Sequence, residues 1–162
     1  MLRKVTLPLG TSGELFLSAM PGRYRPLDED IAEAKDKGIG RVVCLVPEDD
    51  IDTKSPQYAD ALRSRALPWP VEQFPIGDSG LPASRDSFAA LASRIAGHLD
   101  SGERILLHCV LGVGRTGTVA ICILIALGIP AEKAVNLVRA AGSSPETHDQ
   151  HRLVEWFAEK GL

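Results

Sequence analysis

Long apolar runs and an excess of charge are both missing from this sequence of 162 residues. The longest apolar stretch, from Val119 to Ile129, is too short to cross a bilayer. The apolar residues after Met1 to Lys4 are also too few for a signal peptide. A formal net charge of −3 gives no reason to expect a polybasic membrane patch or binding to nucleic acid. We therefore expect a soluble chain with neither a membrane nor a nucleic acid as its partner.

Cysteine is scarce, and no linker divides the chain. The three cysteines lie in or beside apolar runs, and an odd number does not fit a disulfide framework. This usage predicts a reducing compartment, and hence a cytoplasmic protein. The sequence has no Ser/Gly-rich linker, low-complexity run or internal repeat, and its length suits one sizeable core. We expect one domain over residues 1–162, acting as a monomer.

Strand-like and helix-like segments alternate along the sequence. Short β-branched or apolar runs predict strands at 14–19, 41–46, 71–76 and 105–109. Helical patterns are predicted near 27–37, 55–67, 84–99, 115–128, 130–141 and 146–159, whereas 47–50 is interpreted as an acidic connection. This order indicates an α/β three-layer sandwich, with a mostly parallel sheet of four to five strands flanked by helices. Ligands bind such sheets at the carboxyl ends of the strands.

The segment from His108 to Thr118 dominates the functional interpretation. It follows a buried strand and precedes a buried helix, and it contains Gly112, Gly114 and Gly117. These glycines let the backbone bend so that successive N–H groups point inward, and the helix beginning near Arg115 adds the positive end of its dipole. The loop is therefore suited to an oxyanion such as phosphate.

Two side chains distinguish this loop from an ordinary phosphate cradle. Cys109 stands at the strand end, and Arg115 follows after five residues. Inward amides, a helix N-terminus and a guanidinium stabilise a thiolate as well as a phosphate, and Arg115 can bind two phosphate oxygens at once. Thr116 places a hydroxyl where it could hydrogen-bond the sulfur. No lysine precedes Thr116 or Thr118, which excludes the nucleotide-binding loop with its Gly-Lys-Ser/Thr ending.

The pattern His108, Cys109, five residues, Arg115, Thr116 and Gly117 resembles the signature of the cysteine-dependent protein tyrosine phosphatases. The whole loop is similar to that of small, atypical dual-specificity phosphatases. Residues 17–22, 38–43 and 74–78 also resemble parts of dual-specificity and kinase-associated phosphatases. Low-molecular-weight tyrosine phosphatases and arsenate reductases place the motif near the N-terminus, whereas here it lies in the last third of the chain.

The resemblance implies a phosphomonoester hydrolase with tyrosine or dual specificity, which forms a cysteinyl-phosphate and needs no cofactor or metal. Its partner would be a phosphorylated protein or peptide. Cys109 would be the nucleophile, Arg115 would bind the phosphate, and Thr116 would assist the thiolate as it leaves. The residues implied to line the phosphate site are Val110, Leu111, Gly112, Val113, Gly114 and Arg115.

The family's general acid is an aspartate about thirty residues before the cysteine, inside a Pro-Ile-x-Asp pattern, and Asp78 occupies that place. Without the resemblance, an aspartate between glycines is most often a turn residue. Asp86 is the rival, although its helical surroundings fit an acid in a first turn.

Four further residues have more than one interpretation. His108 either orients the loop, as in the family, or is a buried histidine with satisfied hydrogen bonds. Gln150 matches a glutamine that the family places near the pocket, but residues 140–145 depart from the usual Arg-Pro-Gly and look one residue short. His148 and His151 have a spacing that could hold a metal, yet no third ligand is evident, and we interpret them as surface residues.

Alternatives remain for the reaction and for a second cysteine. Lipid phosphatases of this superfamily often have lysines inside the loop, whereas Val110, Leu111 and Val113 are apolar, which favours a less highly charged substrate. A phosphoinositide or another non-protein phosphomonoester is the second candidate substrate, and a catalytically inactive phosphate-binding adaptor is the candidate from another class. Cys44 and Cys122 are expected to pack as small apolar residues, although Cys44 could also act as a resolving thiol for an oxidised Cys109.

Overall fold

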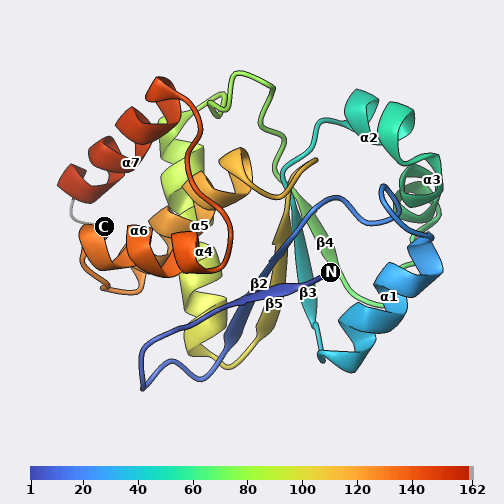
Figure 1. Ribbon diagram of the computed structural model, residues 1–162, viewed down its shortest axis with the longest axis horizontal. Coiled ribbons are helices and arrows are strands. Elements are labelled where there is room, and N and C mark those ends of the chain that lie inside the picture. The colour runs from blue at the N-terminus through green and yellow to red at the C-terminus, as the bar shows by residue number, and fades with distance from the viewer. Residues whose placement is uncertain (161–162) are drawn as a thin grey trace.

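A mixed β-sheet forms the centre of the computed structural model, which describes residues 1–160 (Figure 1). Within these residues the sheet has five strands, in the order β1-β2-β5-β3-β4. They are β1 (Arg3–Val5), β2 (Glu14–Ser18), β3 (Arg41–Cys44), β4 (Val71–Gln73) and β5 (Arg104–His108). Strand β1 pairs with β2 antiparallel, and the other neighbouring pairs are parallel. The carboxyl ends of four strands therefore meet at one edge.

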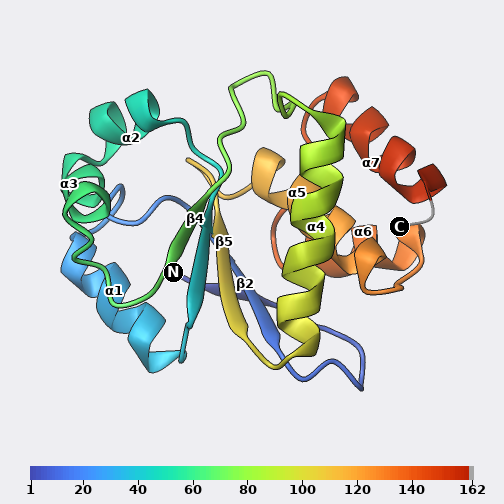
Figure 2. The ribbon, with the colours of Figure 1, turned by 180° about the vertical axis from the view of Figure 1, so that it is seen from behind.

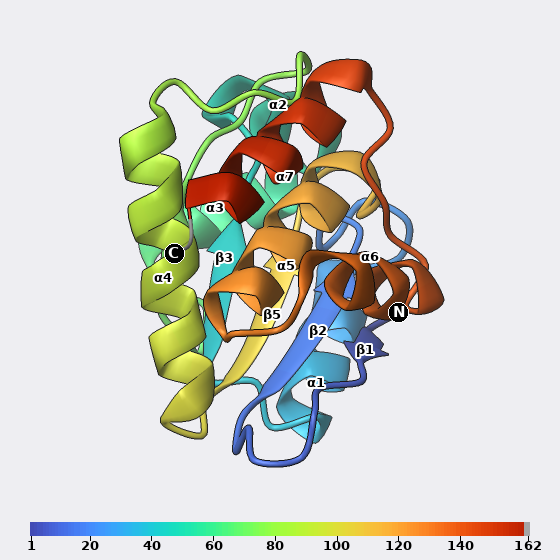
Figure 3. The same ribbon diagram turned by 90° about the vertical axis from the view of Figure 1, so that its left-hand side faces the viewer.

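Helices cover both faces of this sheet, as Figures 1 and 2 show from opposite sides. One face carries α1 (Leu27–Asp36), α2 (Glu48–Lys54) and α3 (Pro56–Ser64). The other carries α4 (Arg85–Asp100), α5 (Gly114–Ala126), α6 (Ala131–Ala140) and α7 (His148–Lys160). Figure 3 looks onto this second layer, where α5 lies between the sheet and its neighbouring helices. The predicted α/β three-layer sandwich is confirmed.

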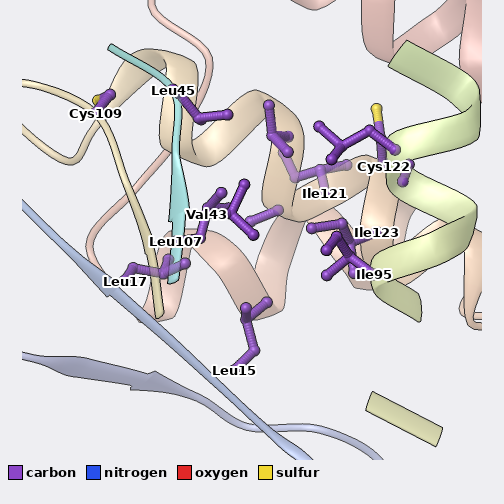
Figure 4. Close-up of a cluster of buried hydrophobic side chains, with 14 of the residues drawn as sticks. Leu15, Leu17, Val43, Leu45, Ile95, Leu107, Cys109, Ile121, Cys122 and Ile123 are labelled. Atoms are coloured by element: carbon purple, nitrogen blue, oxygen red, sulfur yellow. The ribbon is translucent and has the colours of Figure 1, made fainter. Parts of the chain in front are cut away.

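Strand alternation divides the apolar side chains between the two layers. Leu15, Leu17, Val43 and Leu107 lie in the large cluster formed with the α4 to α7 layer (Figure 4). The intervening residues Phe16, Val42 and Leu106 form a smaller cluster on the α1 side. Helix α5 is buried almost all round, and its residues 116–125 are at most 9% exposed. A helix fixed on all sides gives the preceding loop a rigid support.

The sequence interpretation missed two elements and overestimated a third. The acidic connection after Pro47 is in fact the start of α2, whose acids Glu48, Asp49 and Asp50 all lie in the first helical turn. That helix buries only Ile51, so it left little apolar periodicity in the sequence. Strand β1 has only three residues. Strand β4 ends at Gln73 rather than at 76, although the amides of Phe74 and Ile76 still bond to Cys44 and Leu45.

Among residues 1–160, no helix combines the length and apolarity that a bilayer crossing would need. The expectation of one catalytic domain over 1–162 stays a prediction, and its last two residues lie outside the described part of the chain.

The packing of the core predicts that substitutions of two aliphatic residues change the free energy of unfolding by very different amounts. Ile123 is fully buried in α5 (Figure 4), so Ile123→Ala should lower the free energy of unfolding by about 2–5 kcal/mol. Leu9 is fully exposed, and Leu9→Ala should change it by less than about 0.5 kcal/mol. Urea unfolding followed by circular dichroism measures both values. A small loss at Ile123 would contradict the assigned packing of α5.

Candidate active site

The loop from Cys109 to Val113 connects β5 to α5 at the carboxyl edge of the sheet. Cys109 follows the last residue of β5 and is 2% exposed, while Leu111 projects outward with 55% exposure. Figure 4 shows Cys109 beyond the strand end, well apart from Cys122 on the far side of α5. The predicted nucleophile is therefore buried at the base of the loop, and the loop reaches solvent at Leu111.

The Cys109 sulfur accepts a hydrogen bond from the amide of Gly112, with an N to Sγ distance of 3.2 Å. Gly112 has a φ of +76°, and a Cβ there would lie 2.4 Å from the carbonyl oxygen of Ser18. Only glycine fits this conformation and this contact without strain. The loop thus turns an N–H group onto the sulfur.

Arg115, in the first turn of α5, is 11% exposed. Its Nη1 donates to the carbonyl oxygen of Ile76 at 2.7 Å, and its Nη2 lies 3.7 Å from a carboxylate oxygen of Asp78. The arginine is therefore anchored to the segment that follows β4 and keeps a second nitrogen near Asp78. Its planar fork is suited to two phosphate oxygens.

The candidate acid, Asp78, belongs to the loop between β4 and α4 and is 82% exposed. This loop is the green segment that arches over the carboxyl edge of the sheet in Figures 1 and 2. The rival, Asp86, lies in the first turn of α4, where a carboxylate stabilises the helix dipole. The structure therefore brings Asp78, but not Asp86, into contact with Arg115.

Thr116 differs from its expected contact. Its side chain is fully buried, and its hydroxyl has no hydrogen-bond partner among the residues that the structure describes. The expected bond from this hydroxyl to the Cys109 sulfur is therefore not formed, and the sulfur bonds instead to the Gly112 amide. Burying a hydroxyl without a hydrogen-bond partner costs about 1–3 kcal/mol of folding free energy. The Thr116 hydroxyl is therefore available to hydrogen-bond a bound ligand.

His108 is fully buried and hydrogen-bonded through both ring nitrogens. Its Nε2 lies 2.8 Å from the hydroxyl of Tyr58 in α3, and its Nδ1 lies 3.1 Å from the carbonyl oxygen of Cys109. Because that carbonyl can only accept, we assign the proton to Nδ1, and the Tyr58 hydroxyl donates to Nε2. Burial lowers the pKa of His108 to about 4, so the ring is neutral at pH 7.

The other two cysteines are buried in the apolar core. Burial raises the pKa of Cys44 to about 11 and also raises the pKa of Cys122. In the β3 to β5 register, Cys44 lies opposite His108, one residue before Cys109. A protonated, buried thiol fits packing better than nucleophilic attack, and the resolving role stays a prediction.

Gln150 reaches the site despite the irregular sequence before it. The residue is 3% exposed, and its Oε1 accepts from the amides of Glu146 and Thr147 at 2.7 and 3.3 Å. A Cβ at Gly80 would lie 2.1 Å from its Nε2, and a Cβ at Gly114 would lie 3.2 Å from its Oε1. Gln150 therefore packs between the loop that bears Asp78 and the first residue of α5. His148 and His151 are both exposed, as expected.

Sequence reasoning missed three residues that contact the loop: Arg3, Tyr58 and Ser143. Arg3 Nη2 and Ser143 Oγ both donate to the carbonyl oxygen of Gly112. Tyr58 holds His108 from the opposite helical layer. All three lie far from the loop in sequence. Only Tyr58 offered a signal, because a buried tyrosine usually needs a hydrogen-bond partner for its hydroxyl.

Comparison with known proteins places the site in a family context. The model for "Polymorphic toxin system, DSP-PTPase phosphatase" matches residues 18–129, more than half of the chain. The matched residues include Asp78, Cys109 and Arg115, whereas Arg3 and Gln150 lie outside them.

One relative is "Putative tyrosine phosphatase 067L" of Invertebrate iridescent virus 3, which is 41% identical over 70 residues. This alignment covers 41% of the chain and 29% of the relative, so the chain matches less than a third of that protein. Kinase associated phosphatase, solved with its catalytic-site cysteine replaced by serine, has a TM-score of 0.85 at 23% identity, covering 99% of this chain and 94% of that one.

Two further structures share the fold. Tk-PTP in its active form has a TM-score of 0.72 at 26% identity, covering 95% of this chain and 99% of that one. PTPMT1 in complex with PI(5)P also has a TM-score of 0.72, at 13% identity and 91% coverage of each chain.

The buried histidine predicts a loss of stability in acid. Since the His108 pKa falls from 6.5 in the unfolded chain to about 4 in the folded one, only the unfolded chain binds the proton between these values. The contribution of His108 is complete above pH 6.5 and falls by about 1.4 kcal/mol per pH unit below it, until about pH 4. Urea unfolding across this range should give a shallower slope for His108→Gln than for the wild type. Equal slopes would contradict the prediction.

Proposed function

Because the chain belongs to the DSP-PTPase phosphatase family of polymorphic toxin systems, we propose that it hydrolyses phosphotyrosine in proteins or peptides, with dual specificity as an extension. The supporting observation is the grouping at one strand end of a buried sulfur that accepts an amide hydrogen bond, a buried guanidinium and an exposed carboxylate. Cys109, Arg115 and Asp78 are those three groups. We propose that residues 1–162 act as one catalytic domain.

In the first proposed step, the Cys109 thiolate attacks phosphorus in line with the ester oxygen. The S–P bond forms as the P–O bond to the leaving group breaks, and Asp78 gives its proton to the leaving oxygen. Arg115 and the loop amides stabilise the charge on the three remaining oxygens. The exposed position of Asp78 agrees with a group that must reach a substrate outside the loop.

In the second proposed step, water cleaves the cysteinyl-phosphate. Asp78, now a carboxylate, takes a proton from the water while the water oxygen attacks phosphorus. The S–P bond breaks, and inorganic phosphate is released. The thiolate that leaves is stabilised by the Gly112 amide. The unpartnered hydroxyl of Thr116 is the group we propose to bond to the sulfur or to a phosphoryl oxygen during turnover.

Two exposed leucines, on the loops that bear Cys109 and Asp78, support an aromatic phosphoester as the substrate. Leu111 in the loop is 55% exposed, and Leu81, three residues after Asp78, is 37% exposed. Side chains of this kind can pack against a phenyl ring, and the loop has no lysine for additional phosphates. The structural similarity to PTPMT1, solved in complex with PI(5)P, keeps a phosphoinositide as the second candidate substrate. Measuring the hydrolysis of phosphopeptides and of phosphoinositides by the same enzyme distinguishes the two candidates.

We further propose that the enzyme works as a monomer in the cytoplasm, without a metal or another cofactor. Within residues 1–160, no group of three or more His, Cys, Asp or Glu side chains is placed to hold a metal ion. Hydrolysis of p-nitrophenyl phosphate should accordingly persist in excess EDTA.

Replacing the nucleophile tests the whole assignment. Cys109→Ser should lower the kcat for p-nitrophenyl phosphate by more than about 10³, because the serine hydroxyl is not ionised at pH 7. The variant should still bind inorganic phosphate, measured by calorimetry, since Arg115 and the amides are kept. Phosphate binding without turnover in the wild type would support an adaptor instead, and substantial turnover by Cys109→Ser would overturn the cysteine mechanism.

A matched pair of aspartates tests the general acid. Asp78→Asn should lower kcat by about 10²–10⁴ for phenyl phosphate, whose leaving group needs a proton, and by less for an ester of a more acidic phenol. Asp86→Asn, eight residues away in α4, should leave kcat near the wild-type value. A large loss at Asp86 with a silent Asp78 would transfer the role.

A further inference from the structure

The loop from Cys109 to Val113, here called the phosphate loop, is held on its outer side at one carbonyl group. The oxygen of Gly112 accepts two hydrogen bonds, each of 2.6 Å, from Arg3 Nη2 and from Ser143 Oγ. On the other side of the same residue, the Gly112 amide points to the Cys109 sulfur. Gly112 is therefore fixed by its amide inside the loop and by its carbonyl outside it.

Arg3 reaches this carbonyl from the edge strand β1. Its register partner is Leu17 of β2, and its Nη1 donates to Ala141 O at 2.8 Å and to Ser143 Oγ at 3.0 Å. A Cβ at Gly142 would lie 2.7 Å from Nη1, so a glycine leaves the room that the guanidinium occupies. One side chain thus joins β1, the connection between α6 and α7, and the phosphate loop.

Peptide geometry connects this outer bond to the inner surface of the loop. The peptide between Gly112 and Val113 is trans, so its C=O and the Val113 N–H point in opposite directions. Two donors that hold the Gly112 oxygen outward therefore direct the Val113 N–H toward the side where the Gly112 N–H meets the sulfur. Glycine permits other backbone conformations at this position, so the orientation needs external bonds.

The charge on Arg3 acts in the same direction. Burial lowers the pKa of Arg3, whereas a negative charge on the Cys109 sulfur would raise it. The two groups are linked through Gly112, whose carbonyl accepts from Arg3 and whose amide donates to the sulfur. An arginine stays protonated under such conditions. A charged donor makes a stronger hydrogen bond than a neutral one and adds positive potential behind the loop.

We propose that Arg3 is a positioning residue of the phosphatase site, which acts through the Gly112 carbonyl to aim the Val113 amide at a phosphoryl oxygen. Ser143 is its partner on the same carbonyl. The inference rests on the proposed function for its substrate, but its two donors, Arg3 and Ser143, lie outside the matched family segment.

The test compares substitutions of two neighbouring basic residues of β1, Arg3 and Lys4. Arg3→Ala should raise the inhibition constant of inorganic phosphate and lower kcat/KM for p-nitrophenyl phosphate by about tenfold each, the effect of one charge-assisted hydrogen bond. Lys4→Ala is the control, because the Lys4 ammonium pairs with Glu14 at 2.7 Å and, among residues 1–160, forms no side-chain hydrogen bond or ion pair with the loop. Arg3→Lys, which keeps the charge but not the fork, should give an intermediate value.

Ser143→Ala keeps the proposal testable if Arg3→Ala fails to fold. It should weaken phosphate binding in the same direction but by less, because its donor is neutral. The double variant should show less than the sum of the two free-energy changes, since both side chains serve one carbonyl. In ¹⁵N spectra, the Val113 amide resonance should shift in both single variants and not in Lys4→Ala.

Lower melting temperatures with an unchanged phosphate inhibition constant and an unshifted Val113 resonance would show that Arg3 is only structural, and would overturn the proposal. That result would leave the proposed enzyme intact, because the wild type would still turn over substrate. If the wild type binds phosphate by calorimetry without turnover, the enzyme assignment fails, and tenfold weaker binding by Arg3→Ala still supports the positioning role.

Discussion

The site depends on one constraint, namely that a loop which turns its amides inward must find donors for the carbonyls that consequently point outward. In this structure the donors come from several parts of the chain. The Val110 carbonyl accepts from the Met20 amide, and the Val113 carbonyl accepts from the amides of Gly117 and Ser144. The Gly112 carbonyl has Arg3 and Ser143. The conformation of this loop is therefore a property of the surrounding fold as much as of its own sequence.

The two helical layers contribute differently to this arrangement. The α4 to α7 layer contains α5, whose burial fixes the axis along which its N-terminal amides point. The opposite layer contributes Tyr58, which holds His108 and, through it, the carbonyl of Cys109. The end of β5 and the loop after it are thus bonded from both faces of the sheet, which explains how the loop keeps one conformation.

Contiguous features could be predicted from the sequence, and long-range ones could not. The order of strands and helices follows from local periodicity, and the grouping of Cys109 with Arg115 follows from a short motif whose turn brings them together. The approach of Asp78 was predicted only through resemblance. Arg3 contacts a residue 109 positions away, and no local pattern encodes such a pairing. The Gln150 contact was in doubt because residue counting assumes a fixed path through 140–145, which the structure does not require.

The close approach of Gly80 to Gln150 has a consequence for the loop that bears Asp78. Because a Cβ at position 80 would stand 2.1 Å from the amide nitrogen of that glutamine, α7 defines a hard stop against which the loop rests. The stop is set by a helix outside the loop of Cys109, so the position of the loop that bears Asp78 depends on a residue far from both loops in sequence. A shift of α7 would therefore move the loop that bears Asp78, while Asp78, Cys109 and Arg115 themselves stay unchanged.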